Sequence, residues 1–389
     1  MPRKLLPGLC LTLALVTAGC QDQKPEPLAP TGPQFALQST ATPKLDLSRV
    51  SLLRKRPPIQ DLQATTPLAR RAINPGDYVC SSTPLVDYLN QTINEAFAVE
   101  PDILLTLLDF AADQVPTYDA ILFQTEATPQ SFGYDGEYTR RMITTEKDLK
   151  RFWDINSGPI QLVGMHGTML LDVERVARVY EAVFTSGGQP IPHSLALQFA
   201  RIVHDALAAS QTMDGGDWPL FSFNAFAVPG DGGSPPKIVM GDGVLESYKV
   251  IGFDDVAPQA VYAHEFGHHV QFQKGYFDDP RATSGDAAEQ TRYTELMADA
   301  FGAYYLTHKR GAALNRKRVT QFLQVYFNVG DCAFDNPGHH GTPLQRMRAA
   351  TFGFNVADQA QKQGHILTAD QFHRLFLAAY PSFIAPDAT

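Results

Sequence analysis

AHEFGHHVQF occupies residues 263–272 and is the stretch that decides which fold this chain must build. His264, Glu265 and His268 lie within it at the spacing His-Glu-x-x-His. On a helix, residues four apart lie on one face, so both imidazoles can point at a single metal ion about 2 Å away. Glu265 sits one position further round, where it can take a proton from water beside the metal. The stretch therefore predicts a helix that carries a catalytic zinc ion.

Two helices are predicted around this motif. The first covers residues 254–275, where Pro258 suits the first turn and Gly275 ends the helix. Apolar residues on both sides of the two histidines bury this helix against the rest of the protein. The second covers residues 285–311, and Asp286 can cap its first turn. The two helices are close enough in the chain to form one site.

A catalytic zinc ion needs a third protein ligand, and it keeps one open position. The His-x-x-Gly-x-x-His continuation of one large class is absent, because Gln271 occupies one of its places. Glu295 on the second helix is the predicted third ligand, and Glu289 is the rival. Asp299, one turn after Glu295, can accept the free ring N–H of His264 and so orient it. The alternative is a solvated acidic face, but the apolar neighbours of these acids indicate burial.

These residues resemble the gluzincin metallopeptidases, in which His-Glu-x-x-His is followed by Glu-x-x-x-Asp on a later helix. HEFGHHVQ (264–271) and ELMADAFGAYYLTH (295–308) are similar to the bacterial neutral zinc metallopeptidases. NAFAVPGDGG (224–233) and HGTPLQR (340–346) more weakly resemble the CAAX-prenyl endopeptidase and heat-shock protease group. The resemblance covers about residues 218–352 and departs from the last group in lacking transmembrane helices.

The resemblance implies further roles for residues outside the two helices. A histidine followed six places later by an arginine lies near the metal in the membrane group, and His340 and Arg346 keep that spacing here. They would donate hydrogen bonds to the oxyanion of the tetrahedral intermediate. His339 is an equally close neighbour, so the choice between the two histidines stays open. An edge strand that pairs with an extended substrate is implied for Asn224, Ala225, Phe226 and Ala227.

The N-terminus has the pattern of an export signal. Arg3 and Lys4 precede an apolar stretch that is too short to span a bilayer comfortably. TAGC ends this stretch at Cys20 and resembles the bacterial lipoprotein processing box, which implies a signal peptide over residues 1–19 and a lipid on Cys20. An ordinary cleaved signal is the alternative. Residues 20–79 are rich in proline and polar residues and are predicted to form a flexible tether.

Two of the four cysteines remain once Cys10 leaves with the signal and Cys20 takes the lipid. In an oxidising compartment Cys80 and Cys332 are expected to form one disulfide, with two buried free thiols as the alternative. Neither cysteine has a second cysteine or histidine at zinc-ligand spacing, so a structural zinc site on them is not expected.

The fold class predicted is α+β, mostly helical, with a small antiparallel-edged sheet and two core helices that carry the zinc site. Residues 80–190 are predicted as a helical N-terminal region of unknown role and residues 191–389 as the metallopeptidase domain. Runs of β-forming residues with glycine and proline breaks place the sheet within residues 218–252.

The chain of 389 residues carries a net charge of −9, which argues against nucleic acid as a partner. The predicted function is a zinc-dependent endopeptidase that cleaves proteins or peptides, anchored to a membrane of the bacterial cell envelope by lipid or else secreted. A non-catalytic envelope binding module on the same scaffold is the first alternative. A structural or storage zinc protein is the second, and it requires a fourth protein ligand.

Overall fold

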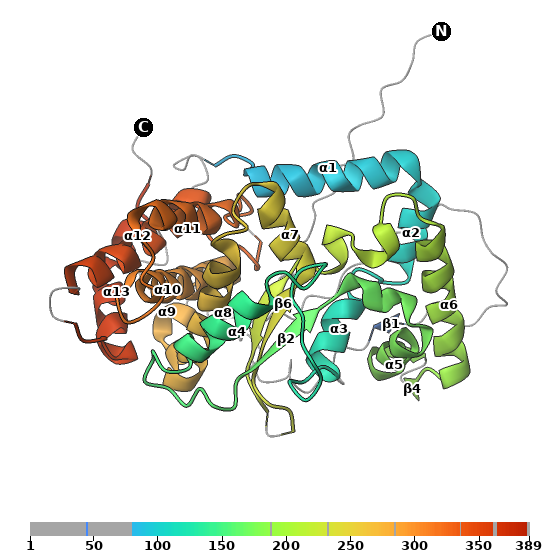
Figure 1. The fold of residues 1–389 in the computed structure, drawn as a ribbon, viewed down its shortest axis with the longest axis horizontal. Helices are drawn as coiled ribbons and strands as arrows, with labels where there is room; N and C mark the ends of the chain where they lie inside the picture. The colour runs from blue at the N-terminus through green and yellow to red at the C-terminus, as the bar shows by residue number, and fades with distance from the viewer. Residues whose placement is uncertain are drawn as a thin grey trace, which may run out of the picture.

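The computed structural model describes residues 44–45, 80–186, 189–231, 233–283, 285–334, 336–360 and 364–386. The predicted signal peptide, the lipidation site Cys20 and all of the predicted tether except residues 44–45 lie outside these ranges. The predicted fold class is confirmed, since the described residues are mostly helical with a small sheet (Figure 1).

The helices in the first half of the described chain are α1 (Pro84–Val99), α2 (Pro101–Asp109), α3 (Val115–Leu122), α4 (Thr139–Leu149), α5 (Val173–Val183) and α6 (His193–Ala209). Those in the second half are α7 (Asp242–Val250), α8 (Ala257–Lys274), α9 (Pro280–Thr283), α10 (Ala287–Thr307), α11 (Arg316–Asn328), α12 (Pro343–Ala360) and α13 (Ala369–Phe383). The strands are β1 (Lys44–Leu45), β2 (Gln161–Met165), β3 (Phe184–Ser186), β4 (Gln189–Pro190), β5 (Ala225–Val228) and β6 (Lys237–Gly241).

The central sheet has the strand order β2-β6-β5. β2 pairs with β6 in parallel, and β5 pairs with β6 antiparallel, so the described part of this sheet has an antiparallel edge at β5 as predicted. The second, outlying sheet is antiparallel throughout, in the order β1-β3-β4. Its strand β1 comes from within the segment predicted as a tether.

The central sheet separates two hydrophobic cores, because successive side chains of a strand point to opposite faces. Ile238 and Met240 of β6 join the first core with α8, α10, α11, α12 and α13, whereas Val239 between them joins the second core with α2, α3, α5 and α6. Figure 1 shows these two groups of helices on opposite sides of β2 and β6. Each core contains residues from both sides of position 190, and the predicted domain boundary there stays a prediction.

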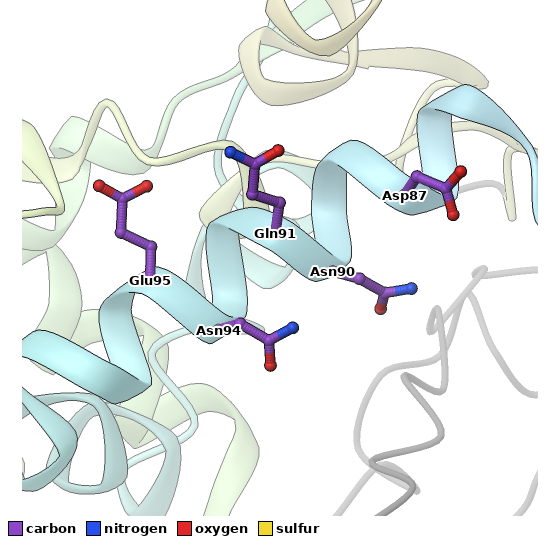
Figure 2. Close-up of a pocket in the computed structure, with 5 residues that line it drawn as sticks. All are labelled: Asp87, Asn90, Gln91, Asn94 and Glu95. Carbon is purple, nitrogen blue, oxygen red and sulfur yellow. The ribbon is translucent and has the colours of Figure 1, made fainter.

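Helix α1 is amphipathic and lies along one side of the molecule (Figure 1). Its Leu85 and Leu89 are buried, Leu85 within the first core, whereas its polar side chains cover the surface. Figure 2 shows five of them around a hollow on that surface, namely Asp87, Asn90, Gln91, Asn94 and Glu95. The two faces explain why the spacing of apolar residues in this segment predicts a helix.

Residues 242–250 correct one expectation from the sequence. They are rich in β-forming residues and were expected to extend the sheet, but they form α7. The strand β6 ends at Gly241, where a β-carbon would collide with the backbone of Ser222 and Asn224. The chain turns into a helix there because Val244, Leu245 and Tyr248 then share one buried face. Tertiary packing has overridden the local propensity.

No helix in the described part of the chain has both the length and the apolar character needed to cross a membrane.

Candidate metal centre

The predicted helix that carries His-Glu-x-x-His is α8, and it packs against α10, which carries Glu295 and Asp299. Two glycines allow the helices to approach closely. A β-carbon at Gly267 would lie 3.0 Å from Cα of Ala298, and one at Gly302 would lie 3.2 Å from the carbonyl carbon of Ala263. Gly275 ends α8 in the left-handed conformation, with φ 71°, as the sequence predicts.

His264, His268 and Glu295 form a group of three donors that can hold a metal ion. The Nε2 atoms of the two histidines are 3.2 Å apart. Glu295 Oε2 lies 3.2 Å from His264 Nε2, and Glu295 Oε1 lies 3.4 Å from His268 Nε2. Donors about 2.0–2.1 Å from one ion at the tetrahedral angle are about 3.3 Å apart. The three separations therefore fit a single tetrahedral ion of the size of zinc.

Each histidine is oriented by a partner on its other ring nitrogen. Asp299 Oδ1 lies 2.8 Å from Nδ1 of His264, and Oε1 of Gln271 lies 3.0 Å from Nδ1 of His268. Both oxygens accept the Nδ1–H, which leaves the lone pair of each Nε2 directed at the other donors. The amide of Gln271 also donates to the carbonyl of Thr294 on α10 (2.7 Å), so its own orientation is fixed.

Arg346 on α12 completes the network behind the donors. Its Nε and Nη2 donate to the two oxygens of Asp299 at 2.8 and 2.7 Å, and both side chains are fully buried. The remaining nitrogen, Nη1, faces Glu295 Oε2 at 3.6 Å and His340 Nδ1 at 3.4 Å. The guanidinium predicted to bind an oxyanion is thus mainly engaged with Asp299, and it fixes the carboxylate that orients His264.

The charges of this group favour a cation. Burial alone raises the pKa of Glu295, but the neighbouring imidazoles, that of His340 first, hold it well below its usual range. Burial lowers the pKa of His264, yet the carboxylates of Asp299 and Glu295 outweigh this and raise it to about 10. Without a metal ion the group therefore retains a proton, and a divalent ion can replace that proton.

Glu265 lines the same cavity beside the donors and is buried. Burial raises the pKa of its carboxyl to about 7, and the charge of Glu295 adds to the rise. A carboxylate whose pKa is near neutral can both accept and return a proton. The adjacent histidine His269 is different, because its Nε2 donates to the carbonyl of Lys237 (2.9 Å) and burial lowers its pKa to about 4.

A cleft of about 220 Å³ opens onto the donors. Its lining includes all four residues of the predicted substrate strand, which are Asn224, Ala225, Phe226 and Ala227. The last three lie on the edge strand β5. Most of the remaining lining is apolar, and much of it comes from α1, α7, α8 and α11. The cleft therefore brings together residues that are up to about 260 positions apart in the sequence, from Leu85 to Arg346.

The two candidate histidines of the following loop lie differently. His340 lines the cleft, and its Nδ1 is 3.9 Å from Glu295 Oε2. Burial lowers the pKa of His340, the carboxylate of Glu295 opposes this, and the charge of Arg346 adds to the lowering. Its Nε2 is buried and, within the described residues, has no hydrogen-bond partner. His339 is fully buried and is bound through Nδ1 to Asp331 (2.6 Å).

Two residues of the site were missed by sequence reasoning, Gln271 and Asp331. Gln271 could have been found, because it follows His268 by three positions on the same helix. Asp331 gives no such signal, since it reaches the site through a loop.

The rival ligand Glu289 lies in the first turn of α10 and is not one of the three donors. Cys80 and Cys332 form a disulfide bond.

No protein family, curated protein or solved structure matches this chain. The geometry of the donor group therefore carries the functional argument.

Proposed function

We propose that the protein is a zinc-dependent endopeptidase of the gluzincin type that acts in the bacterial cell envelope. The observation that carries the proposal is the donor group of His264, His268 and Glu295, which has three protein donors at tetrahedral separations beside an open cleft. Catalytic zinc sites have three protein ligands and an open position, whereas structural sites have four. Neither His339 nor His340, the candidates for the fourth ligand of a closed site, belongs to the donor group.

Zinc bound by these three residues would polarise the carbonyl of the scissile bond and lower the pKa of water towards 7. Glu265 accepts the proton of the attacking water and returns it to the leaving amine, because its raised pKa suits both transfers. The ring of His340 accepts from Arg346 at Nδ1, which places its proton on Nε2. That Nε2–H donates to the oxyanion that develops on the substrate.

The cleft favours an extended polypeptide as the substrate. The edge strand β5 has β6 as its partner in the described part of the sheet, and residues 224–227 line the cleft. An extended segment can add to such an edge by backbone hydrogen bonds. The predicted export signal and the disulfide between Cys80 and Cys332 support an extracytoplasmic location, with a lipid on Cys20 as the proposed anchor to the membrane.

The test replaces Glu265 by glutamine in the zinc-loaded protein. We expect cleavage of casein to fall by about 10²–10⁴-fold while the zinc content stays the same, because the base is lost and no ligand is changed. Glu289→Gln on α10 is the matched control, since it makes the same chemical change outside the donor group, and it should keep the parental rate.

Cleavage by Glu265→Gln at the parental rate would show that Glu265 is not the base. A zinc-loaded native protein that binds polypeptides but cleaves none would instead be a binding module. Activity that is lost to a chelator and restored by zinc supports the enzyme.

A further inference from the structure

The disulfide between Cys80 and Cys332 lies next to the cleft and joins two distant parts of the chain, which are 252 positions apart. Cys80 precedes α1, whose Leu85, Val86 and Leu89 line the cleft. Cys332 lies in the loop between α11 and α12 that carries His340. A second contact reinforces the junction, because Thr83 Oγ1 donates to the carbonyl of Asn328 at 2.8 Å.

Asp331, the residue before Cys332, holds the loop through both of its carboxylate oxygens. Oδ2 accepts the backbone N–H of His340 (2.8 Å), and Oδ1 binds Nδ1 of His339 (2.6 Å). The backbone N–H of Asp331 also donates to the carbonyl of Gly341 (3.0 Å). Burial by itself raises the pKa of Asp331, but His339 holds it below the usual range, so this carboxylate is charged.

The position of the His340 ring depends on this arrangement, because the described residues of the loop that carries it form no helix or strand. Loops of this kind open locally at low free energy unless they are tied to the core. The ring of His340 lines the cleft, and its buried Nε2 has no hydrogen-bond partner among the described residues. A displacement of about 1 Å of such a group can cost about 100-fold in rate.

We propose that Asp331 is a positioning residue, and that the Cys80–Cys332 disulfide fixes it so that the Nε2–H of His340 points at the reacting carbonyl. The proposal rests on the proposed peptidase function. It adds that the covalent link between Cys80 and Cys332 supports the activity of the site without changing the metal ligands, because none of the three donors lies in the loop.

The test compares Cys80→Ser/Cys332→Ser, Asp331→Ala and Asp331→Asn with the native zinc-loaded protein. We expect the first two variants to lower kcat by about 10–100-fold, because the ring of His340, which would donate to the oxyanion of the transition state, is displaced. The zinc affinity and KM should change less than about twofold, because no metal ligand is altered. Asp331→Asn retains one acceptor oxygen for His340 N–H and should recover part of the loss. Asn94→Ala on the exposed face of α1 is the control and should match the native protein (Figure 2).

Two probes separate positioning from a general structural effect. A phosphonamidate peptide mimics the tetrahedral intermediate and should bind the disulfide variant more weakly by the same factor as kcat, whereas a simple hydroxamate should bind equally well. Combining Asp331→Ala with His340→Ala should cost no more than His340→Ala alone, because both changes remove one interaction. Losses that add, or a zinc affinity that falls together with kcat, would overturn the proposal.

A readout that needs no turnover separates this proposal from the proposed function. The ¹⁵N-histidine NMR spectrum of the zinc-loaded protein should show one fixed tautomer of His340, and averaged, broadened signals in the disulfide variant. If the native protein neither cleaves peptides nor binds the phosphonamidate, the peptidase function fails, and unchanged His340 signals in the variant overturn the positioning role separately.

Discussion

The helix pair α5–α6 packs through apolar side chains, whereas the pair α8–α10 buries charged and polar side chains as well. The buried residues of α5 and α6 are alanine, valine, leucine and one tyrosine. Those of α8 and α10 include two histidines, glutamates, an aspartate, an arginine and a glutamine. Burial of an unpaired charge is costly, so each of these groups needs a partner. The buried contact of the second pair therefore depends on a specific set of polar partners, whereas the buried contact of the first pair depends on the shape of apolar side chains.

The largest effect in this comparison is expected from the metal. Zinc at about 1,000 times its Kd should raise the free energy of unfolding of the native protein by about 4 kcal/mol. His268→Ala should lose most of this gain in stability, because only two of the three protein donors remain to bind zinc. Zinc-dependent shifts in urea unfolding measure the effect, and His204→Ala on α6 is the control. Equal stabilisation of His268→Ala would mean that zinc binds elsewhere.

The next effect tests the apolar pair. Leu207→Ala on α6 deletes a fully buried side chain and should lower the free energy of unfolding by about 3 kcal/mol. The affinity for zinc, measured by titration calorimetry on the folded variant, should stay unchanged, because Leu207 belongs to the second core. A weakened zinc site would show that the two helix pairs are coupled across the sheet.

A smaller effect concerns the orientation of one ligand. Asp299→Asn should weaken zinc binding by about 10–100-fold, because the partner of His264 loses its charge while the three donors stay in place. Competition with a zinc chelator measures the change. Asp286→Asn at the N-cap of α10 retains a capping side chain and should bind zinc normally. Unchanged affinity in Asp299→Asn would remove the role assigned to Asp299.

The smallest effect is a pH dependence in the apolar half. Burial raises the pKa of Asp113, between α2 and α3, from its usual value of 3.8 to about 6. The native state thus binds more protons than the unfolded state between these values, and stability falls as the pH rises from about 4 to 6. Asp113→Asn should remove this slope, which is at most about 1.4 kcal/mol per pH unit for one group. Urea unfolding at pH 4 and pH 7 measures it, and an unchanged slope would contradict the assignment.

The sequence predicted the elements whose signals are local. Two imidazoles four positions apart have to share a helix face, Gly275 has to end α8, and Asp286 caps α10 through the backbone N–H of Glu289. Glu295 and Asp299 were found because acids within an apolar run need buried partners. The segment after β6 was predicted wrongly, because β-forming residues at 242–250 also give a helix with one buried face.

What the sequence alone determined is therefore the donor set, since ligand type and helical spacing are properties of a few neighbouring residues. The tertiary structure decided which of His339 and His340 faces the cleft, that Arg346 binds Asp299, and that Asp331 holds the loop. These contacts join α8, α10, α12 and a loop that is tied to α1 by the disulfide. The packing of these elements fixes them, and no local spacing in the chain encodes how distant segments meet.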